Sequence, residues 1–276
     1  MNYGPSKTRL VVRKQFAPND TDRLHKEGQK LCILKNIGES SKLFKVPEVV
    51  YVGSDFYELE YIPNAKNLSE CGFLYSPKDL QDKLFAIMDN IAAYEPSSGD
   101  VWDAMLAKFK QLKALDPEYD ELVARLPTNL VFPNQDGYSH GDLSFDNIMY
   151  ANGDLYLIDP AWSAIESPLW DVGKILQSVL INWQGIKDKG RALQDDRPGW
   201  MTALCYNVKG GAMLDDLMKK YSYDGVLLAT ACQLSRVARW CFPEVLIPII
   251  KKLLHIYFND SGVGPDGNTD ALRRII

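Results

Sequence analysis

The sequence predicts an α+β fold with two lobes, a small strand-rich N-terminal lobe and a larger, mainly helical C-terminal lobe. Strand-like alternation of apolar and polar residues is concentrated before residue 62, and helical periodicity dominates from Ser76 onward. The chain has 276 residues, 46% hydrophobic and 24% charged, which suits one large domain or two lobes. We expect a small lobe over 1–62, a linker over 63–76 and a helical lobe over 77–276.

Composition excludes several classes of protein. The net charge of −5 disfavours nucleic acid and anionic membranes as partners. The five cysteines are an odd number without a C-x-x-C pair, and only three histidines are present, which disfavours a disulfide framework and a zinc site. Neither a signal peptide nor a membrane-spanning run is found. We therefore expect a protein of the reducing cytoplasm.

The first predicted elements place two charged residues on apolar faces. Residues 10–16 alternate as a strand would, and Lys14 shares a face with apolar neighbours. A helix predicted over residues 20–38 puts Glu27 in an apolar stripe. Two further strands are expected over residues 48–52 and 56–62. A lysine and a glutamate buried separately would be costly, whereas as a pair they are tolerable.

The helical lobe begins with clear start signals and contains one hairpin. Ser76 is suited to cap a helix, and Pro77 is suited to the first helical position. The dipeptide Asn152-Gly153 predicts a tight turn between two short strands. Those strands are expected over residues 148–150 and 155–158, and further helices near residues 101–115, 117–126, 169–183, 214–221, 226–240 and 245–258. An active site is expected between the lobes, where ligand pockets tend to form.

The most informative segment runs from His140 to Asp159 and reads HGDLSFDNIMYANGDLYLID. It places Asp142 and, five residues later, Asn147 on a loop, and it ends with Asp159 after an apolar strand. Phosphoryl transfer needs a base beside the acceptor hydroxyl and oxygen ligands that hold magnesium against the phosphates. Asp142 suits the first role, and Asn147 and Asp159 suit the second. The alternative is that Asp142 and Asn147 only form turn and capping bonds.

This segment resembles the catalytic and metal-binding segments of the aminoglycoside phosphotransferase and choline kinase family, the small-molecule branch of the protein-kinase-like fold. The resemblance rests on the HGD motif, on the asparagine five residues after its aspartate, and on a hairpin that leads into IDP. It implies a protein-kinase-like fold, with ATP as phosphoryl donor and magnesium as the metal. It also implies that Asp142 is the catalytic base, that Asn147 and Asp159 are metal ligands, and that His140 braces the catalytic loop.

The resemblance also assigns nucleotide-binding roles to residues of the small lobe. Lys14 resembles the strand lysine that holds the α- and β-phosphates, and Glu27 resembles the helix glutamate that orients it. Arg13 is the rival to Lys14, and solvent-exposed charges are the alternative for both members of the pair. The segment FYELEYIP resembles the hinge, where backbone groups from Glu60 to Ile62 would bind an adenine-like base.

The sequence departs from the family pattern at its start. Only one glycine, Gly4, precedes Lys14, so the expected strands and glycine-rich loop cannot be identified, and the small lobe is expected to be short. A loop from Gly4 to Lys7 could reach the phosphates, a partner chain could supply the element, or nucleotide binding could be weak or absent. Downstream, Asp171 resembles the family's structural aspartate beneath the catalytic loop. Only eleven residues separate it from Asp159, and no A-P-E motif follows, which disfavours a protein substrate.

The residues after Asp159 leave the acceptor open. Trp162, Glu166 and Trp170 stand where contacts to a cationic substrate would be useful, although each also fits a core or surface position. Pro160-Ala161-Trp162 replaces the aromatic-acidic-aromatic run usual in choline kinases, which disfavours choline.

The sequence thus predicts an ATP- and magnesium-dependent kinase that phosphorylates a hydroxyl of a small molecule, such as an amino sugar, a sugar or an amino alcohol. Two alternatives stay open. One is a catalytically silent kinase-like module that binds a metabolite or a partner. The other is a metal-dependent hydrolase that uses the same three residues on ATP without an acceptor. The oligomeric state is not predicted.

Overall fold

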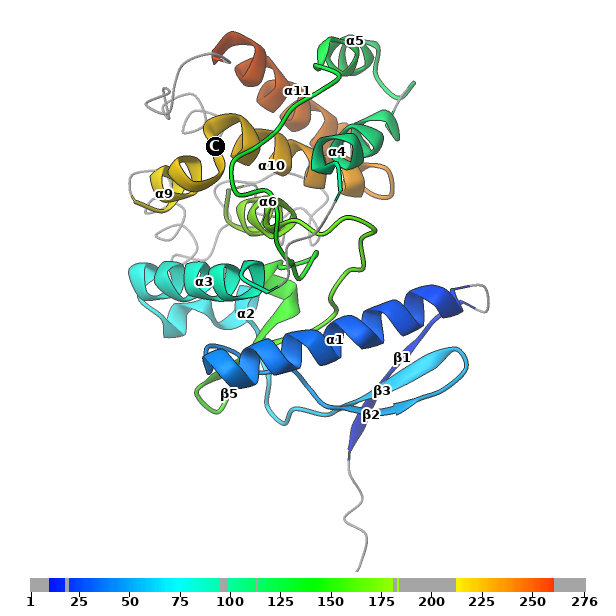
Figure 1. The fold of residues 1–276 in the computed structure, drawn as a ribbon, viewed down its shortest axis with the longest axis vertical. Coiled ribbons are helices and arrows are strands. Elements are labelled where there is room, and N and C mark those ends of the chain that lie inside the picture. The colour runs from blue at the N-terminus through cyan, green and yellow to red at the C-terminus, as the bar shows by residue number, and fades with distance from the viewer. Residues whose placement is uncertain are drawn as a thin grey trace, which may run out of the picture.

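The structure of the chain is a computed structural model that describes residues 10–17, 20–94, 99–112, 114–180, 183 and 212–260. A small three-stranded sheet and one long helix lie at one end, and a body of helices lies at the other (Figure 1). This arrangement confirms the predicted α+β fold with a strand-rich N-terminal part and a helical C-terminal part. The predicted loop from Gly4 to Lys7 lies outside the described residues, as do Cys205 and residues 181–182 of the helix predicted over 169–183.

Over its described residues, the small lobe has four elements. They are β1 (Val11–Gln15), α1 (Thr21–Ser41), β2 (Val49–Val52) and β3 (Phe56–Glu60). The strands are antiparallel in the order β1-β3-β2, so β3 is central. Lys14 pairs with Tyr57 and Val12 with Leu59, and both of these partners are buried. Lys14 therefore lies on the buried face of the sheet, as the alternation predicts.

Helix α1 is longer than predicted. It continues past Gly38 to Ser41, and Lys42 ends it with φ of 58° and an N–H bond to the Gly38 carbonyl. A Cβ at Gly38 would lie 2.6 Å from the Phe44 carbonyl oxygen, so the glycine lets the chain fold back closely against the helix. This return carries Lys45 to the second sheet.

The second sheet joins the two parts of the chain. Its strands are β4 (Lys66–Asn67), β5 (Ile148–Ala151) and β6 (Asp154–Leu157), in that order. Asn152 and Gly153 both have positive φ, 52° and 91°, as the predicted tight turn requires. Lys45 adds a short parallel bridge, because its N–H donates to the Leu155 carbonyl and its own carbonyl accepts from Leu157.

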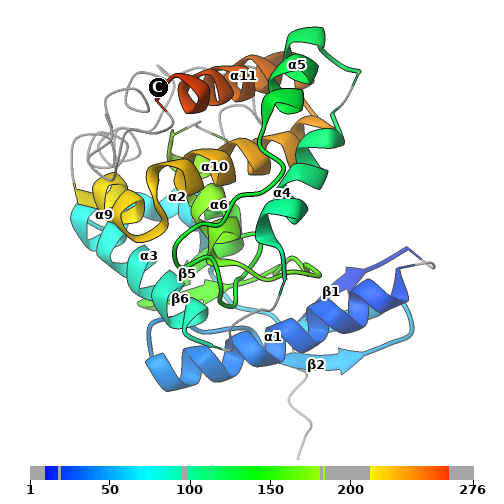
Figure 2. The ribbon, with the colours of Figure 1, turned by 45° about the horizontal axis from the view of Figure 1, so that its top comes forward.

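The helices pack around α6 and α10, which cross the centre of the helical part (Figure 2). Their bounds, with those of the short 3-10 helices η1 and η2, are α2 (Leu68–Cys71), η1 (Gly72–Leu74), α3 (Pro77–Ala92), α4 (Val101–Lys110), α5 (Pro117–Arg125), η2 (Phe145–Asn147), α6 (Pro168–Leu180), α9 (Ala212–Tyr221), α10 (Tyr223–Ala238) and α11 (Pro243–Asp260). The segment predicted as a linker contains β4, α2 and η1. Helix α3 begins as predicted, with Ser76 as its cap and Pro77 at its first position.

Close packing of α6 against α10 depends on a small residue. A Cβ at Gly173 would lie 2.6 Å from the Ala229 carbonyl oxygen, so only glycine permits this approach. Both helices are almost fully buried along the described part. The two helices therefore form a rigid base beneath the loop that carries Asp142. Within the described ranges, no helix combines the length and apolar character needed to cross a bilayer.

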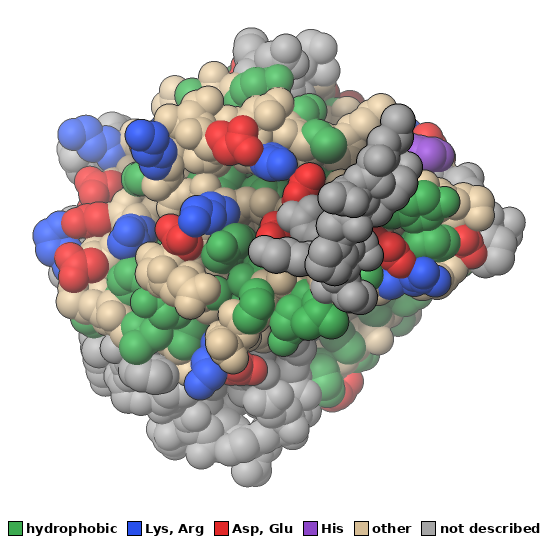
Figure 3. Space-filling view, turned by 90° about the horizontal axis from the view of Figure 1, so that it is seen from below, with side chains coloured by type: hydrophobic (Ala, Val, Ile, Leu, Met, Phe, Trp, Pro, Cys, Tyr) green, Lys and Arg blue, Asp and Glu red, His purple; other side chains and the backbone are tan. Residues whose placement is uncertain are grey.

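The three-stranded sheet keeps apolar side chains exposed. Leu10 is 67% exposed, Val12 50% and Tyr51 56%, and strand β1 stands at the edge of the sheet. Figure 3 views the molecule from this end and shows hydrophobic patches between charged side chains. Val12 lies two residues before Lys14 on the same face, so an apolar surface adjoins the lysine.

Candidate active site

The structure brings Lys14, Glu27 and Asp159 together from three separate segments. The Lys14 Nζ lies 2.8 Å from Glu27 Oε2 and 3.3 Å from Asp159 Oδ1. Strand β1 supplies the lysine, helix α1 supplies the glutamate, and the turn after β6 supplies the aspartate. Arg13 lies on the other face of the sheet, where it pairs with Glu58 at 2.7 Å. Of the two candidates, Lys14 is therefore the one in contact with Glu27.

Burial differs sharply across this trio. Glu27 is 1% exposed and accepts a second bond, at 2.7 Å, from the exposed Arg23. The Lys14 side chain is 29% exposed and that of Asp159 is 47% exposed. Burial alone would lower the pKa of Lys14, yet the charges of Asp159 and Glu27 raise it above its ordinary value. A permanently charged ammonium group thus stands at an accessible surface, held by a buried carboxylate.

The loop before β5 places Asp142 and Asn147 beside each other. The Asn147 Nδ2 donates to the Asp142 carbonyl at 2.9 Å, and the Ser144 N–H donates to the same carbonyl at 2.8 Å. The Ile158 N–H donates to the Asn147 carbonyl at 3.0 Å, which brings Asn147 next to the strand that leads to Asp159. Turn hydrogen bonds, which the alternative interpretation of Asp142 and Asn147 expects, are therefore present. These bonds do not use the Asn147 Oδ1 or either carboxylate oxygen of Asp142.

Asp171 supports this loop from below. Its two carboxylate oxygens accept the N–H groups of His140 at 2.7 Å and Gly141 at 2.8 Å. Burial raises the pKa of Asp171 to about 7, although the two N–H donors and Lys30 oppose the rise. The contacts match the structural role that the resemblance implies for Asp171.

His140 is fully buried, and burial together with the charge of Lys30 lowers its pKa to about 3. A neutral imidazole with this pKa is poorly suited to accept a proton near neutral pH. The carbonyl of His140 accepts the N–H of Ala161 at 3.0 Å. The loop that carries Asp142 is thereby fixed to the segment that follows Asp159.

Asp142 itself faces two cations that the sequence analysis did not single out. Its Oδ1 lies 3.0 Å from the Nζ of Lys174 on α6, and Arg236 on α10 donates to the neighbouring Gly141 carbonyl at 3.3 Å. Burial would raise the pKa of Asp142, but Lys174 and Arg236 lower it, and the net shift is downward. The carboxylate is 30% exposed and ionised, so it can orient a hydroxyl and receive its proton.

A second buried ion pair links α1 to the segment after Asp159. Lys30 is 1% exposed, and its Nζ donates to both carboxylate oxygens of Glu166 and to the Ala161 carbonyl, each at 2.8 Å. The Ser139 hydroxyl also donates to Glu166, at 2.5 Å. Lys30 could have been found from the sequence, because it lies one turn after Glu27 on the same helix face. Its partner, 136 residues away, could not.

The three residues considered for a cationic acceptor have other contacts. The Glu166 carboxylate is bound by Lys30 and Ser139. Trp170 is 2% exposed and donates to the Ile165 carbonyl, which makes it a core residue. Trp162 is 42% exposed, and the ammonium of Lys26 lies 3.9 Å from its ring centroid.

The hinge segment offers one backbone donor to a ligand. The N–H groups of Glu60 and Tyr61 donate to the carbonyls of Glu48 and Leu10. Within the described part of the chain, the N–H of Ile62 has no acceptor, and the residue is half-buried. A donor without an acceptor among the described residues fits the predicted contact with an adenine-like base.

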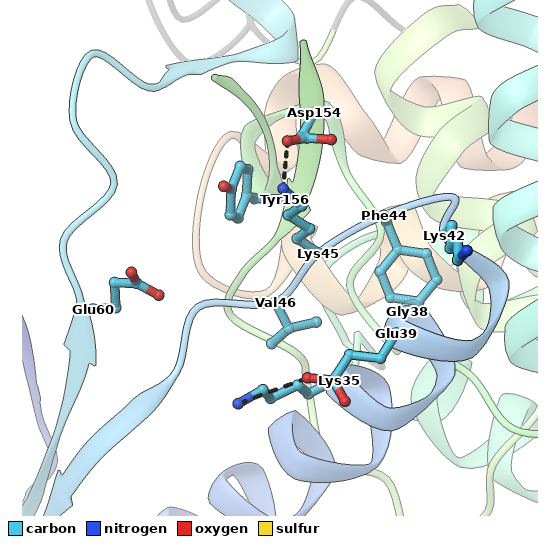
Figure 4. A pocket seen from close by; sticks show the side chains of 10 residues that line it. All are labelled: Lys35, Gly38, Glu39, Lys42, Phe44, Lys45, Val46, Glu60, Asp154 and Tyr156. Atoms are coloured by element: carbon cyan, nitrogen blue, oxygen red, sulfur yellow. Dashed lines mark hydrogen bonds and ion pairs between the residues drawn. The ribbon is translucent and has the colours of Figure 1, made fainter. Parts of the chain in front are cut away.

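The side chain of Glu60 points elsewhere. It lines a cavity of about 510 Å³ that also involves Lys35, Phe44 and Val46. Figure 4 shows Glu60 on its own strand across the opening from the pair formed by Lys45 and Asp154. None of the residues lining this cavity is Lys14, Asp142, Asn147 or Asp159. Any role of Glu60 in binding a base would therefore be played by its backbone.

The residues around Asp159 fit a magnesium ion and a nucleotide phosphate. Asp159 has φ of 52° in the left-handed region, and its carboxylate is half exposed beside Lys14. A carboxylate and an amide oxygen are hard ligands of the kind that magnesium binds, with water and phosphate oxygens completing its shell. No group of three or more His, Cys, Asp or Glu side chains that could hold a metal occurs among the described residues. A site made from Asp159 and Asn147 alone therefore depends on the phosphates.

The comparisons with known proteins show the protein-kinase-like fold. No family model matches the chain, and no curated protein matches its sequence. Choline kinase LicA from Streptococcus pneumoniae is similar over 98% of this chain and 86% of its own, with a TM-score of 0.51 and 14% identity. A glucosamine kinase in complex with glucosamine, ADP and inorganic phosphate covers 90% of this chain and 76% of its own, with a TM-score of 0.52 and 13% identity.

An aminoglycoside phosphotransferase solved with GDP is similar over 88% of this chain and 84% of its own, with a TM-score of 0.51 and 17% identity. The predicted resemblance is therefore confirmed at the level of the fold. All three of these structures are of kinases that act on small molecules.

Proposed function

We propose that the protein is a small-molecule kinase that transfers the γ-phosphoryl group of ATP, with magnesium, to a hydroxyl group. The observation that carries the proposal is the contact of Lys14 with both Glu27 and Asp159, next to the loop that bears Asp142 and Asn147. In this proposal Lys14 is the phosphate anchor, Asp159 a metal-binding carboxylate and Asp142 the base, and the bond from the Ile158 N–H to the Asn147 carbonyl links the two groups of residues. The shared fold with small-molecule kinases supports the same conclusion.

The chemistry follows from the charges in the site. The bond between the γ-phosphorus and the oxygen that bridges to the β-phosphate breaks, and a bond from the acceptor oxygen to phosphorus forms. The hydroxyl proton passes to the Asp142 carboxylate, and the products are ADP and a phosphate monoester. Magnesium, when bound to Asn147 and Asp159, would neutralise phosphate charge. Lys14 holds the phosphates, and Glu27 holds Lys14, so positioning and charge supply most of the rate enhancement.

Nucleotide binding is tested by calorimetric titration of ATP, with and without magnesium, into the wild-type protein and Asp159→Ala. We expect magnesium-dependent binding to the wild-type protein that is lost in the variant. Absence of binding to either protein would favour the catalytically silent module. Release of phosphate from ATP without any acceptor, at a rate unaffected by added alcohols, would favour the hydrolase.

The role of Asp142 is tested separately. We expect Asp142→Asn to bind ATP with magnesium while turnover falls by a factor of about 100 to about 10,000, as for loss of a general base. Asp146→Asn is the matched control, because Asp146 lies in the same loop but is bonded to Ser69. Wild-type turnover in Asp142→Asn would remove Asp142 from the role of base.

A further inference from the structure

Cations from two helices flank Asp142 and contact the catalytic loop. Lys174, whose side chain is 7% exposed, pairs with the Asp142 carboxylate, and Arg236 binds the Gly141 carbonyl. Helices α6 and α10 carry these residues and pack tightly against each other. Lys174 pairs with Asp142 directly, whereas Arg236 contacts this loop through the Gly141 carbonyl and has no carboxylate partner of its own among the described residues.

Lys108 on α4 adds a third cation. Helix α4 packs on α10, burial lowers the pKa of Lys108, and the charge of Arg236 lowers it further. Burial raises the pKa of the enclosed Cys232 thiol to about 12, while Lys108, Arg236 and Lys174 all oppose that rise. The Cys232 Sγ lies 3.9 Å from the Met105 carbonyl of α4, so Lys108, one turn after Met105, and Arg236, one turn after Cys232, both belong to the α4–α10 interface.

Across the ranges that the structure describes, neither Lys108 nor Arg236 forms an ion pair with a carboxylate. Half-buried cations without a counter-ion are costly, and a bound anion would compensate them. In contrast, Glu166 and Trp162, which could recognise a cation, are bound by Lys30 and Lys26.

We infer that the acceptor carries an anionic group, a carboxylate or a phosphate, beside its hydroxyl, and that Arg236 and Lys108 bind this group. The inference rests on the proposed function and names its class of substrate. Arg236 is placed to hold the anion next to the catalytic loop while the hydroxyl approaches Asp142. The guanidinium fork matches both carboxylate and phosphate oxygens, and Lys108 contributes a second charge-assisted bond.

A matched set of hexoses tests the charge preference. Glucuronate and glucose 6-phosphate are anionic, glucose is neutral and glucosamine is cationic, while the ring hydroxyls are largely shared. Binding of each is measured by calorimetry without ATP, and ADP release is measured with ATP and magnesium. The same measurements on glycerate, glycerol 3-phosphate, glycerol and 3-amino-1,2-propanediol repeat the test on a three-carbon scaffold and separate carboxylate from phosphate.

The substitutions Arg236→Met and Lys108→Met test the site. We expect the anionic members to bind best to the wild-type protein, and each substitution to weaken that binding by about ten-fold or more. Lys110→Met is the matched control, because Lys110 is an exposed lysine on the same helix and should leave binding unchanged. Arg236→Lys keeps the charge and should recover part of the binding.

The inference is overturned if neutral or cationic members bind as well as the anionic ones, if no anionic member binds, or if the preference survives both substitutions. These results are distinct from failure of the proposed function. If the proposed function fails, ATP with magnesium does not bind to the protein, and no ADP is released with any of the acceptors. A kinase that prefers glucosamine would retain the proposed function and refute the anionic acceptor.

Discussion

Gly141 is the residue at which the loop that carries Asp142 most depends on the absence of a side chain. Its φ is 81°, and a Cβ would lie 2.4 Å from the Ala161 carbonyl oxygen. Gly153, in the hairpin turn, has a similar φ of 91° but open space around it. A substitution at Gly153 therefore measures only the cost of the left-handed backbone. A substitution at Gly141 measures that cost together with the cost of a steric clash.

We expect Gly153→Ala to lower the free energy of unfolding by about 1–2 kcal/mol, the cost of left-handed backbone. Gly141→Ala should cost a further about 1–3 kcal/mol, because the added methyl group forces the loop away from Ala161. Urea denaturation of both variants measures the difference. Equal destabilisation would show that the loop relaxes freely around the clash.

His140 makes the stability of the fold dependent on pH. Its pKa of about 3 in the folded protein lies below the ordinary value of 6.5. Between these values the unfolded chain binds a proton that the folded protein does not, so stability is lost as the pH falls through this window. The loss should approach about 1.4 kcal/mol per pH unit.

His140→Asn removes this contribution, because asparagine does not titrate. We expect the free energy of unfolding to fall less steeply with decreasing pH in the variant than in the wild-type protein, as measured by urea denaturation at a series of pH values. Asp171, whose raised pKa gives the opposite slope, is present in both proteins and does not affect the comparison. Parallel slopes would contradict the buried neutral state of His140.

At the scale of elements, α1 is coupled to the segment after Asp159 by Lys30. The same helix carries Glu27, so the position of Lys14 depends on where α1 lies. Loss of one member of a buried pair leaves an uncompensated charge, at a cost of about 3–5 kcal/mol. We therefore expect Lys30→Met to be strongly destabilising in thermal or urea unfolding.

The double substitution Lys30→Met with Glu166→Gln removes both charges and should recover much of the lost stability. Lys35→Met is the control on the same helix, because its pair with Glu39 is exposed and 3.9 Å long, worth less than about 0.5 kcal/mol. Additive effects of the two single substitutions would exclude energetic coupling between α1 and Glu166.

The helices and strands predicted from the sequence follow from local patterns, and most helices and strands of the described residues agree with these predictions. Lys14 and Glu27 stand out on apolar faces, and Asn152-Gly153 fixes the hairpin turn. Helix α1 extends beyond Gly38, and the helix predicted over 101–115 ends at Lys110. Strand β4 has only two residues and pairs with β5 far away in sequence, so no local period could predict it.

At the scale of the whole molecule, the proposed nucleotide would bind residues of both lobes, Lys14 of the small lobe and Asp159 of the larger one. ATP with magnesium at 100 times its dissociation constant should stabilise the protein by about 2.7 kcal/mol, seen as a higher thermal unfolding midpoint. Removal of magnesium with a chelator should abolish most of this shift, and Asp159→Ala should not show it. A shift that is independent of magnesium would place the phosphates away from Asp159.

The same titration decides between the alternatives for the short small lobe. Val12 and Leu10 are exposed next to Lys14, where the expected glycine-rich loop is not identified in the sequence. Binding by the isolated chain would show that the described sheet and hinge, with the residues before them, suffice for a nucleotide. Binding only at high protein concentration would favour an element supplied by a partner chain.

The sequence by itself determined the fold class, the loop from His140 to Asn147 and the identity of the charged residues on apolar faces. These features are local, because spacing within a strand, helix or turn decides which face a side chain occupies. Only the tertiary structure decided that Lys14 and not Arg13 contacts Glu27 and that Glu166 is bound by Lys30. It also decided that Lys174 and Arg236 flank Asp142. Each of these contacts joins segments that no short-range periodicity relates, and the positions of β1, α1, the segment after Asp159, α6 and α10 in the fold bring them together.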